Sequence, residues 1–259
     1  MLFDSHAHIN DKQFDQDRDE VIRRAREEFG VSLILNVGYN RETIPASLEL
    51  AEKYDFIYSS VGWHPHDAAT CTEEDLNWIR SLTNHPKVVA LGEMGLDYYW
   101  DNSPRDKQAE IFRKQIAIAR ETGLPIIIHD RDAHEDVVRI LQKENAGEVG
   151  GVMHCFGGDL AIMEECLKLN FMIGLGGPVT FKNAKLPKEI AARVPDDRLL
   201  IETDCPYLAP HPFRGKRNET GYVRLVAEQI AGIRGVSLEK LAHMTAQNAK
   251  RLFKLEQRT

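Results

Sequence analysis

The chain lacks several features that would assign it to a common class. It has no apolar run of about 18 residues, so no transmembrane helix and no membrane partner are expected. No basic stretch leads into an apolar one at the N-terminus, which argues against a secretory signal. The cysteines form no C-x-x-C pair and no closely spaced framework, which indicates reduced thiols in a cytoplasmic protein. These cysteines are Cys71, Cys155, Cys166 and Cys205.

Positive charge is also scarce. The 33 lysines and arginines are outnumbered by 40 aspartates and glutamates, and the formal net charge is −7. This balance argues against a surface that coats nucleic acid broadly. It leaves open a nuclease with a local basic patch, in which metal ions supply positive charge. The chain also has no P-loop, no Ser-His-Asp order and no glycine-rich dinucleotide motif.

Short apolar runs alternate with helical patterns along the whole chain. Nearly continuous apolar strands between helices predict a parallel sheet that is buried on both faces. Eight such units in about 250 residues predict a (β/α)8 TIM barrel, formed as a single domain over residues 1–259. An open doubly wound sheet is the alternative, but residues 5–10 lack the glycine-rich turn that it would need. The predicted strands are 2–8, 31–37, 57–63, 88–93, 125–129, 151–155, 171–175 and 199–203.

The helical segments carry apolar stripes and charged faces. Gly123 is predicted to end one helix as a left-handed cap, and Ser237 is predicted to cap the start of the last helix. The predicted helices are 17–29, 43–54, 73–82, 105–122, 132–144, 159–169, 184–194, 220–233 and 237–255.

Metal-type ligands stand at the ends of five predicted strands. His6 and His8 are two residues apart, so in a strand they point to the same face. In a barrel the C-terminal strand ends meet at one face, where active sites lie. Six ionisable groups gathered there would be costly without metal ions or mutual pairing. The predicted ligands are His6, His8, Glu93, His129, His154 and Asp204.

Six protein ligands are too many for one catalytic metal, which usually has three and keeps a position open. They suit two divalent cations that share a bridging carboxylate, for which Glu93 is the candidate. His6, His8 and Asp204 would complete one site, and His129 and His154 the other. Paired cations lower the pKa of a shared water. Ligand softness favours Zn, Mn, Fe or Co over Mg.

On these residues the chain resembles the TatD family of metal-dependent hydrolases, from DSHAH at 4–8 to NAKRLF at 248–253. The resemblance implies a divalent-metal-dependent deoxyribonuclease, in some members a 3′→5′ exonuclease stimulated by Mg. It implies ligation by the same six residues, and it places Glu202 and His64 at the site. Gly157 and Thr220 depart from the family pattern, but neither is a ligand. The other matching motifs are VGWHP at 61–65, LGEMGLDYY at 91–99, IHDRDA at 128–133, HCF at 154–156 and ETDCPYLAP at 202–210.

The predicted catalytic residues are Asp204, Glu202 and His64. Asp204 is placed to ligate a metal and to take the proton of the attacking water. Glu202 lies two residues earlier, hence on the same strand face, and would orient Asp204 or a ligand. A buried salt bridge is an equally good interpretation of Glu202.

The loop after the eighth strand combines cations with aromatic residues. Fixed cations suit a phosphate backbone, and exposed rings suit a terminal base. The expected partner is DNA, as single strands or 3′ ends, with no obligate protein partner; a purely structural, solvated loop is the alternative. Other open functions are hydrolysis of an amide, ester or lactone, including D-aminoacyl-tRNA deacylation, and a scaffold, which would have little use for six ligands. The predicted substrate-binding residues are Arg131, Tyr207, His211, Phe213, Arg214 and Lys216.

Overall fold

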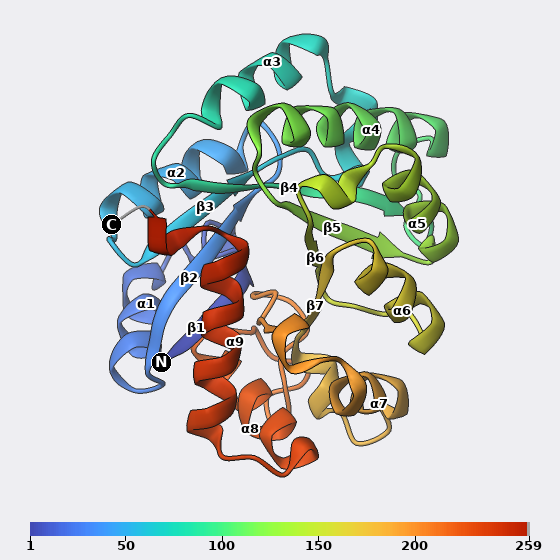
Figure 1. Cartoon of the computed structure of the whole chain (residues 1–259). Coiled ribbons are helices and arrows are strands. Elements are labelled where there is room, and N and C mark those ends of the chain that lie inside the picture. Colours follow the sequence, from blue (N-terminus) through green and yellow to red (C-terminus); the bar gives the residue numbers. More distant parts are fainter. Residues whose placement is uncertain (258–259) are drawn as a thin grey trace.

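The computed structural model describes residues 1–257 and has the predicted barrel. Eight parallel strands follow one another around the sheet in chain order, and helices surround them (Figure 1). The last two residues of the predicted domain lie outside the described part, and a single domain stays a prediction. The strands are β1 (Leu2–Ala7), β2 (Val31–Gly38), β3 (Ile57–Val61), β4 (Val88–Asp97), β5 (Ile126–Arg131), β6 (Gly151–Met153), β7 (Phe171–Leu175) and β8 (Leu199–Ile201).

Backbone hydrogen bonds join the end of β8 to β1. The His8 N–H donates to the carbonyl of Cys205 at 2.8 Å, and the Asp204 N–H donates to the carbonyl of His6 at 2.9 Å. These bonds bring the two ends of the sheet together. They also place the first and last predicted ligands, which are almost 200 residues apart in the chain, beside each other.

A buried carboxylate reinforces this junction. Asp4 accepts hydrogen bonds from the Thr203 N–H at 2.8 Å and from the hydroxyls of Thr203 and Thr220, both at 2.6 Å. Complete burial raises the pKa of Asp4 to about 7, although these hydrogen bonds lower it. Asp4 therefore ties β1 to the segment that follows β8, a role that the sequence did not reveal.

The helices cover the outside of the barrel. The α4 helix ends at Gly123, whose φ of 70° confirms the predicted left-handed cap. The Ser237 side chain accepts from the Lys240 N–H at 3.2 Å, as predicted for the start of α9. Within residues 1–257, no helix is both long and apolar enough to cross a membrane. The α-helices are α1 (Arg18–Glu27), α2 (Thr43–Lys53), α3 (Glu73–Leu82), α4 (Arg105–Thr122), α5 (His134–Lys143), α6 (Leu160–Lys168), α7 (Lys185–Arg193), α8 (Val223–Arg234) and α9 (Leu238–Leu252).

Side chains of the strands form an apolar layer that packs on α9. Side chains two residues apart on a strand point to the same face. The residue two places after each strand member of this layer therefore points the same way, one step closer to the C-terminal end of the barrel. Four such positions, His129, His154, Gly174 and Glu202, belong to the candidate site or border it. The apolar layer consists of Phe3, Leu35, Val89, Ala90, Ile127, Val152, Met172 and Leu200, with Ala246 and Ala249 of α9 and with Phe253 and Leu255, which follow α9.

The strand ends differ from the prediction in an informative way. β4 runs four residues past the predicted end, because its pairing with β5 continues to Asp97 opposite Arg131. β6 and β8 stop earlier than predicted, at Met153 and Ile201. Just beyond them the chain takes positive φ angles, 44° at Cys155 and 57° at Asp204, which strands do not allow.

Candidate metal centre

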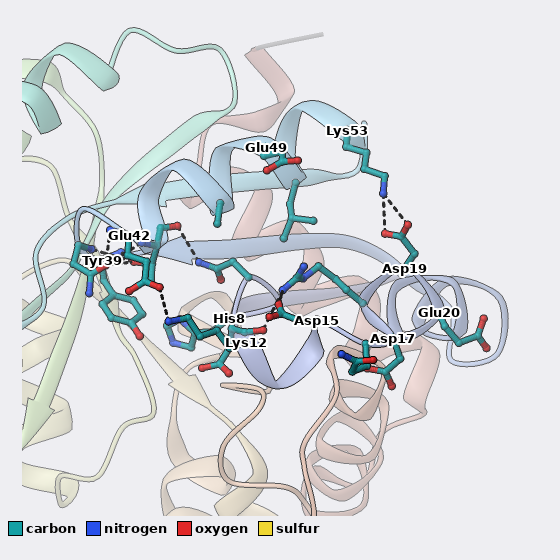
Figure 2. Close-up of a pocket in the computed structure, with 18 residues that line it drawn as sticks. His8, Lys12, Asp15, Asp17, Asp19, Glu20, Tyr39, Glu42, Glu49 and Lys53 are labelled. Atoms are coloured by element: carbon teal, nitrogen blue, oxygen red, sulfur yellow. Dashed lines mark hydrogen bonds and ion pairs between the residues drawn. The ribbon is translucent and has the colours of Figure 1, made fainter.

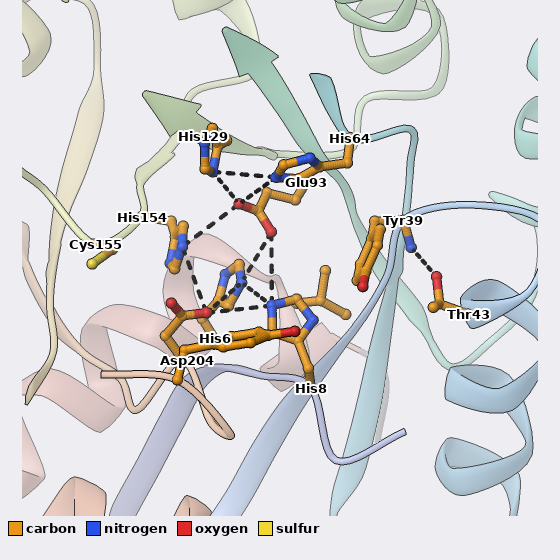
Figure 3. A network of polar contacts seen from close by, with 12 residues as sticks. His6, His8, Tyr39, Thr43, His64, Glu93, His129, His154, Cys155 and Asp204 are labelled. Carbon is orange, nitrogen blue, oxygen red and sulfur yellow. Dashed lines mark hydrogen bonds and ion pairs between the residues drawn. The ribbon is translucent and has the colours of Figure 1, made fainter. Parts of the chain in front are cut away.

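The six predicted ligands meet at the C-terminal end of the barrel, around the Glu93 carboxylate (Figure 3). Its Oε2 lies 3.4 Å from Nε2 of His6 and 3.8 Å from Nε2 of His8. Its Oε1 lies 2.7 Å from Nδ1 of His129 and 3.6 Å from Nε2 of His154. Each oxygen of one buried carboxylate therefore faces a different histidine pair.

Asp204 lies on the opposite side of the histidines from Glu93. Its Oδ1 is 3.3 Å from Nε2 of His8 and 3.8 Å from Nε2 of both His6 and His154. Burial by itself raises the pKa of Asp204, but the nearby histidines, His154 first, outweigh burial and lower it. The same balance holds the pKa of Glu93 well below its usual value. The site thus keeps two carboxylates ionised in a buried position.

The donor set fits metal ions. The Nε2 atoms of His6 and His8 lie only 3.1 Å apart, and their buried Nδ1 atoms have no hydrogen-bond partner in the described part of the chain. Imidazole nitrogens that converge in this way are the usual arrangement of metal-binding histidines. Two sets with donor atoms within 4.8 Å of one another share Glu93: His6 and His8 with Glu93, and Glu93 with His129 and His154.

Glycines let the backbone bring Glu93 and His129 together. Gly92 has a φ of 134°, and a Cβ there would lie 2.6 Å from the carbonyl oxygen of Ile127. Gly95 has a φ of 148°, and a Cβ there would lie 1.9 Å from the carbonyl oxygen of His129. Any side chain would thus push β5 away from β4, which explains the two glycines that flank Glu93.

Asp97 holds His129 from the side opposite Glu93. Its Oδ2 lies 2.9 Å from Nε2 of His129 and 2.8 Å from Nε2 of His66. Burial lowers the pKa of His129, but hydrogen bonds to Asp97 and Glu93 outweigh it and raise the pKa to about 9. The sequence interpretation missed Asp97 and His66. Asp97 lies four residues after Glu93, a spacing that keeps both on one strand face, and this spacing could have identified it.

Glu202 contacts a histidine, not Asp204. Its Oε1 lies 2.9 Å from Nδ1 of His154 and accepts the Cys155 N–H at 2.5 Å. Burial lowers the pKa of His154, but the carboxylates of Glu202, Glu93 and Asp204 raise it to about 10. A Cβ at Gly174 would lie 2.5 Å from Oε2 of Glu202, so this glycine makes room for the carboxylate.

His64 borders the second histidine pair. Its Nε2 lies 3.4 Å from Nδ1 of His129 and 3.6 Å from Oε1 of Glu93. Burial, and after it the neighbouring His129, lower the pKa of His64 to about 4. His64 is therefore a neutral imidazole at the edge of the cluster. It also forms a third group of close donors, with His66 and His129.

A cavity of 720 Å³ opens over the cluster. Of the predicted substrate-binding residues, Arg131 and Tyr207 line it, together with Tyr39, Trp100 and Asn102, which the sequence interpretation did not single out. The other four do not line it. The Phe213 ring stacks on Tyr222 with centroids 4.4 Å apart, and the Arg214 guanidinium lies 4.4 Å from the Phe181 ring. His211 and Lys216 are exposed elsewhere on the same loop.

An eight-stranded α/β barrel with buried histidines and carboxylates at its C-terminal face is the architecture of metal-dependent hydrolases. The family model described as "TatD related DNase" matches residues 3–254, and the chain belongs to this family. It is therefore a metal-dependent hydrolase of the TatD family.

Known proteins similar to the chain match it over nearly its full length. "Uncharacterized metal-dependent hydrolase YabD" of Bacillus subtilis is 60% identical over 98% of this chain and 100% of its own. "3'-5' ssDNA/RNA exonuclease TatD" of Erwinia tasmaniensis is 38% identical, with 98% and 100% covered. The crystal structure of the TatD homologue YjjV from Escherichia coli has a TM-score of 0.92 and 28% identity, and the match covers 98% of both chains.

Proposed function

We propose that the protein is a deoxyribonuclease that removes nucleotides from the 3′ ends of single-stranded DNA and uses two divalent cations. The main observation behind this proposal is that the two carboxylate oxygens of Glu93 face two separate histidine pairs. The name of the Erwinia relative, a 3′→5′ exonuclease of single-stranded DNA and RNA, supports the choice of substrate. So does the open cavity, which Arg131 and exposed aromatic rings line.

The proposed ligands form two groups, one around each carboxylate oxygen of Glu93. His6, His8 and Asp204 would hold one cation with Oε2 of Glu93, and His129 and His154 would hold the other with Oε1. Divalent cations such as Mg, Mn or Zn at these positions make a water nucleophilic near neutral pH and stabilise charge on the phosphate.

The protein's own groups would move the proton and hold the ligands in place. Asp204 is ionised and faces the cavity, so it is the proposed acceptor of the proton of the attacking water. Glu202 and Asp97 are proposed as positioning residues, because each carboxylate lies within 2.9 Å of the far nitrogen of one ligand histidine. Neutral His64 would contact the substrate from the cavity wall.

The test uses metal-stripped protein that is refilled separately with Mg, Mn or Zn. A single-stranded oligonucleotide labelled at its 3′ end is digested beside a copy labelled at its 5′ end. We expect metal-dependent release of the 3′ label as a mononucleotide, and no release by the Asp204→Asn variant with equal metal content.

Two results would contradict the proposal. Early release of the 5′ label would show that digestion starts at the 5′ end, which is the opposite of the proposed polarity. Absence of cleavage with every metal, in protein shown to hold two ions per chain, would exclude the nuclease. Hydrolysis of an ester, a lactone or an aminoacyl-tRNA by that same protein would then identify the alternative reaction.

A further inference from the structure

Two exposed aromatic residues line the cavity over the metal centre. In the described part of the chain, the large apolar side chains with the greatest exposure include Trp100, 57% exposed, and Tyr207, 46% exposed, and both line this cavity. Exposed apolar groups that cluster at a cavity mouth mark a binding surface more often than isolated ones do. The two rings come from the loops after β4 and β8, so they reach the cavity from different parts of the barrel.

The Trp100 loop is anchored to the metal centre and packs beside a cation at the end of β5. The Trp100 N–H donates to Oδ1 of Asp97 at 2.8 Å, and Asp97 also holds His129. The Tyr99 ring packs edge-on against Trp100 with centroids 5.1 Å apart, and the Arg131 guanidinium lies 4.3 Å from the Tyr99 ring. An aromatic face beside a guanidinium is the combination that binds a base and its phosphate.

A second hollow begins on the other side of His8 and Tyr39, which line both. We call it the acidic cleft: it has a volume of 950 Å³ and is bounded by residues 8–20 and 39–53 (Figure 2). Seven carboxylates line it against three basic side chains. Each of these three cations is paired with a carboxylate, as in Lys12 with Glu42 at 2.6 Å and Lys53 with Asp19 at 2.8 Å. Two more of the carboxylates, Asp17 and Glu20, pair with Arg217 and Arg23 outside the lining, and the seven carboxylates still outnumber these five cations.

The two hollows differ in what they offer to a polyanion. A single strand that continued past the metal centre would carry its phosphates into the acidic cleft, where like charges repel them. On the cavity side the strand meets Arg131 and the exposed rings. Four carboxylates also line the cavity: Glu93 and Asp204 are proposed cation ligands, and Asp67 and Asp97 are hydrogen-bonded to Asn40 and His129. Since one side attracts the strand and the other repels it, the site suits a chain end better than the middle of a chain.

We propose that the site is one-ended: the terminal bases of a single strand stack on Trp100 and Tyr207, and the acidic cleft prevents the strand from running through. This inference rests on the proposed nuclease function. It explains digestion from an end by the charge around the metal centre, without a physical barrier.

The first test compares linear with circular single-stranded DNA, together with methyl 4-nitrophenyl phosphate, a diester without a base. We expect wild-type protein to degrade the linear strand and to leave the circle intact. The variant Glu42→Lys/Glu49→Lys reverses two exposed charges of the acidic cleft and is expected to nick the circle at least about 10-fold faster than wild type. Glu164→Lys/Glu189→Lys is the control, with the same change of charge on α6 and α7 and an expected wild-type result.

The second test measures KM and kcat for the linear strand. Trp100→Ala should raise KM about 5- to 100-fold, the range of stacking one base, with a smaller change in kcat. Trp100→Phe keeps a ring and should restore most of the affinity. Leu186→Ala removes an exposed apolar side chain on α7, 37% exposed, and should change neither constant.

The outcomes separate this inference from the proposed function. Hydrolysis of the small diester without degradation of linear DNA would overturn the nuclease proposal, and the inference with it. Degradation of linear DNA with equally fast nicking of the circle by wild type would overturn the inference alone. An intact circle with Glu42→Lys/Glu49→Lys would exclude the role of the acidic cleft, and an unchanged KM for Trp100→Ala would exclude stacking.

Discussion

The interior of the barrel has two layers that the same strands build from opposite kinds of residue. One layer is apolar, with Ile127, Val152 and Leu200 packed on α9. Two residues further along the chain stand His129, His154 and Glu202, in the layer that gathers ionised and metal-type groups. Two residues along the chain therefore separate the apolar layer, which stabilises the fold, from the layer of metal-type groups. Substitutions can change each layer separately.

Loss of the shared carboxylate should have the largest effect. In Glu93→Gln both histidine pairs lose their common negative charge, so we expect lower metal content and a loss of activity of at least about 1,000-fold. Elemental analysis and nuclease assays measure the two effects. Glu164→Gln, an exposed change on α6, is the control. Full occupancy by two metals in Glu93→Gln would contradict the shared role.

Truncation in the apolar layer should act on stability alone. Met172 lies on β7, which contributes no proposed ligand, and it is buried among Val152, Leu200 and their neighbours. Met172→Ala should lower the free energy of unfolding by about 2–5 kcal/mol through lost contacts and the cavity left behind. Denaturant unfolding measures this loss. Metal content and KM should stay at their wild-type values, and a change in either would show that the layers are coupled.

Metal binding should stabilise the charged layer. Cations relieve the repulsion among buried groups and bind only the folded site, so a concentration 100 times the Kd should add about 2.7 kcal/mol. Thermal unfolding of stripped protein with and without Mn or Zn measures this gain as a higher Tm. Glu93→Gln should show much less of it, whereas Met172→Ala should show all of it. An equal rise in Glu93→Gln would indicate binding elsewhere.

The smallest effect is expected for a residue that orients a ligand histidine without binding the metal itself. Asp97→Asn keeps the shape of the side chain but removes the charge that orients His129 and His66, so metal affinity or activity should fall about 10- to 100-fold. Metal titration and kcat/KM measure it. Asp101→Asn, an exposed change in the loop that follows β4, is the matched control. Unchanged metal affinity and activity in Asp97→Asn would mean that Glu93 alone holds His129.

The fold could be read from the chain to a large extent because its signals are local. Apolar runs of strand length alternate with helical stripes eight times, and that number of parallel units in this length fits a closed barrel better than an open sheet. Gly123 and Ser237 confirm that single cap residues mark helix ends. The strand ends were less accurate, because pairing with a neighbour extends β4, and positive φ angles at Cys155 and Asp204 shorten β6 and β8.

The sequence by itself determined the class of fold, the gathering of His6, His8, Glu93, His129, His154 and Asp204 at one end of the barrel, and the family. The fold and the gathering follow because the strand period and the parallel topology bring residues at strand ends together whatever the loops do. The family follows from the resemblance of motifs such as DSHAH at 4–8. Only the tertiary structure decided that Glu202 faces His154, that Asp97 supports His129, and that Trp100 borders the cavity while Arg214 does not. The reason is physical: these contacts depend on backbone turns and side-chain packing between distant segments, which no spacing along the chain encodes.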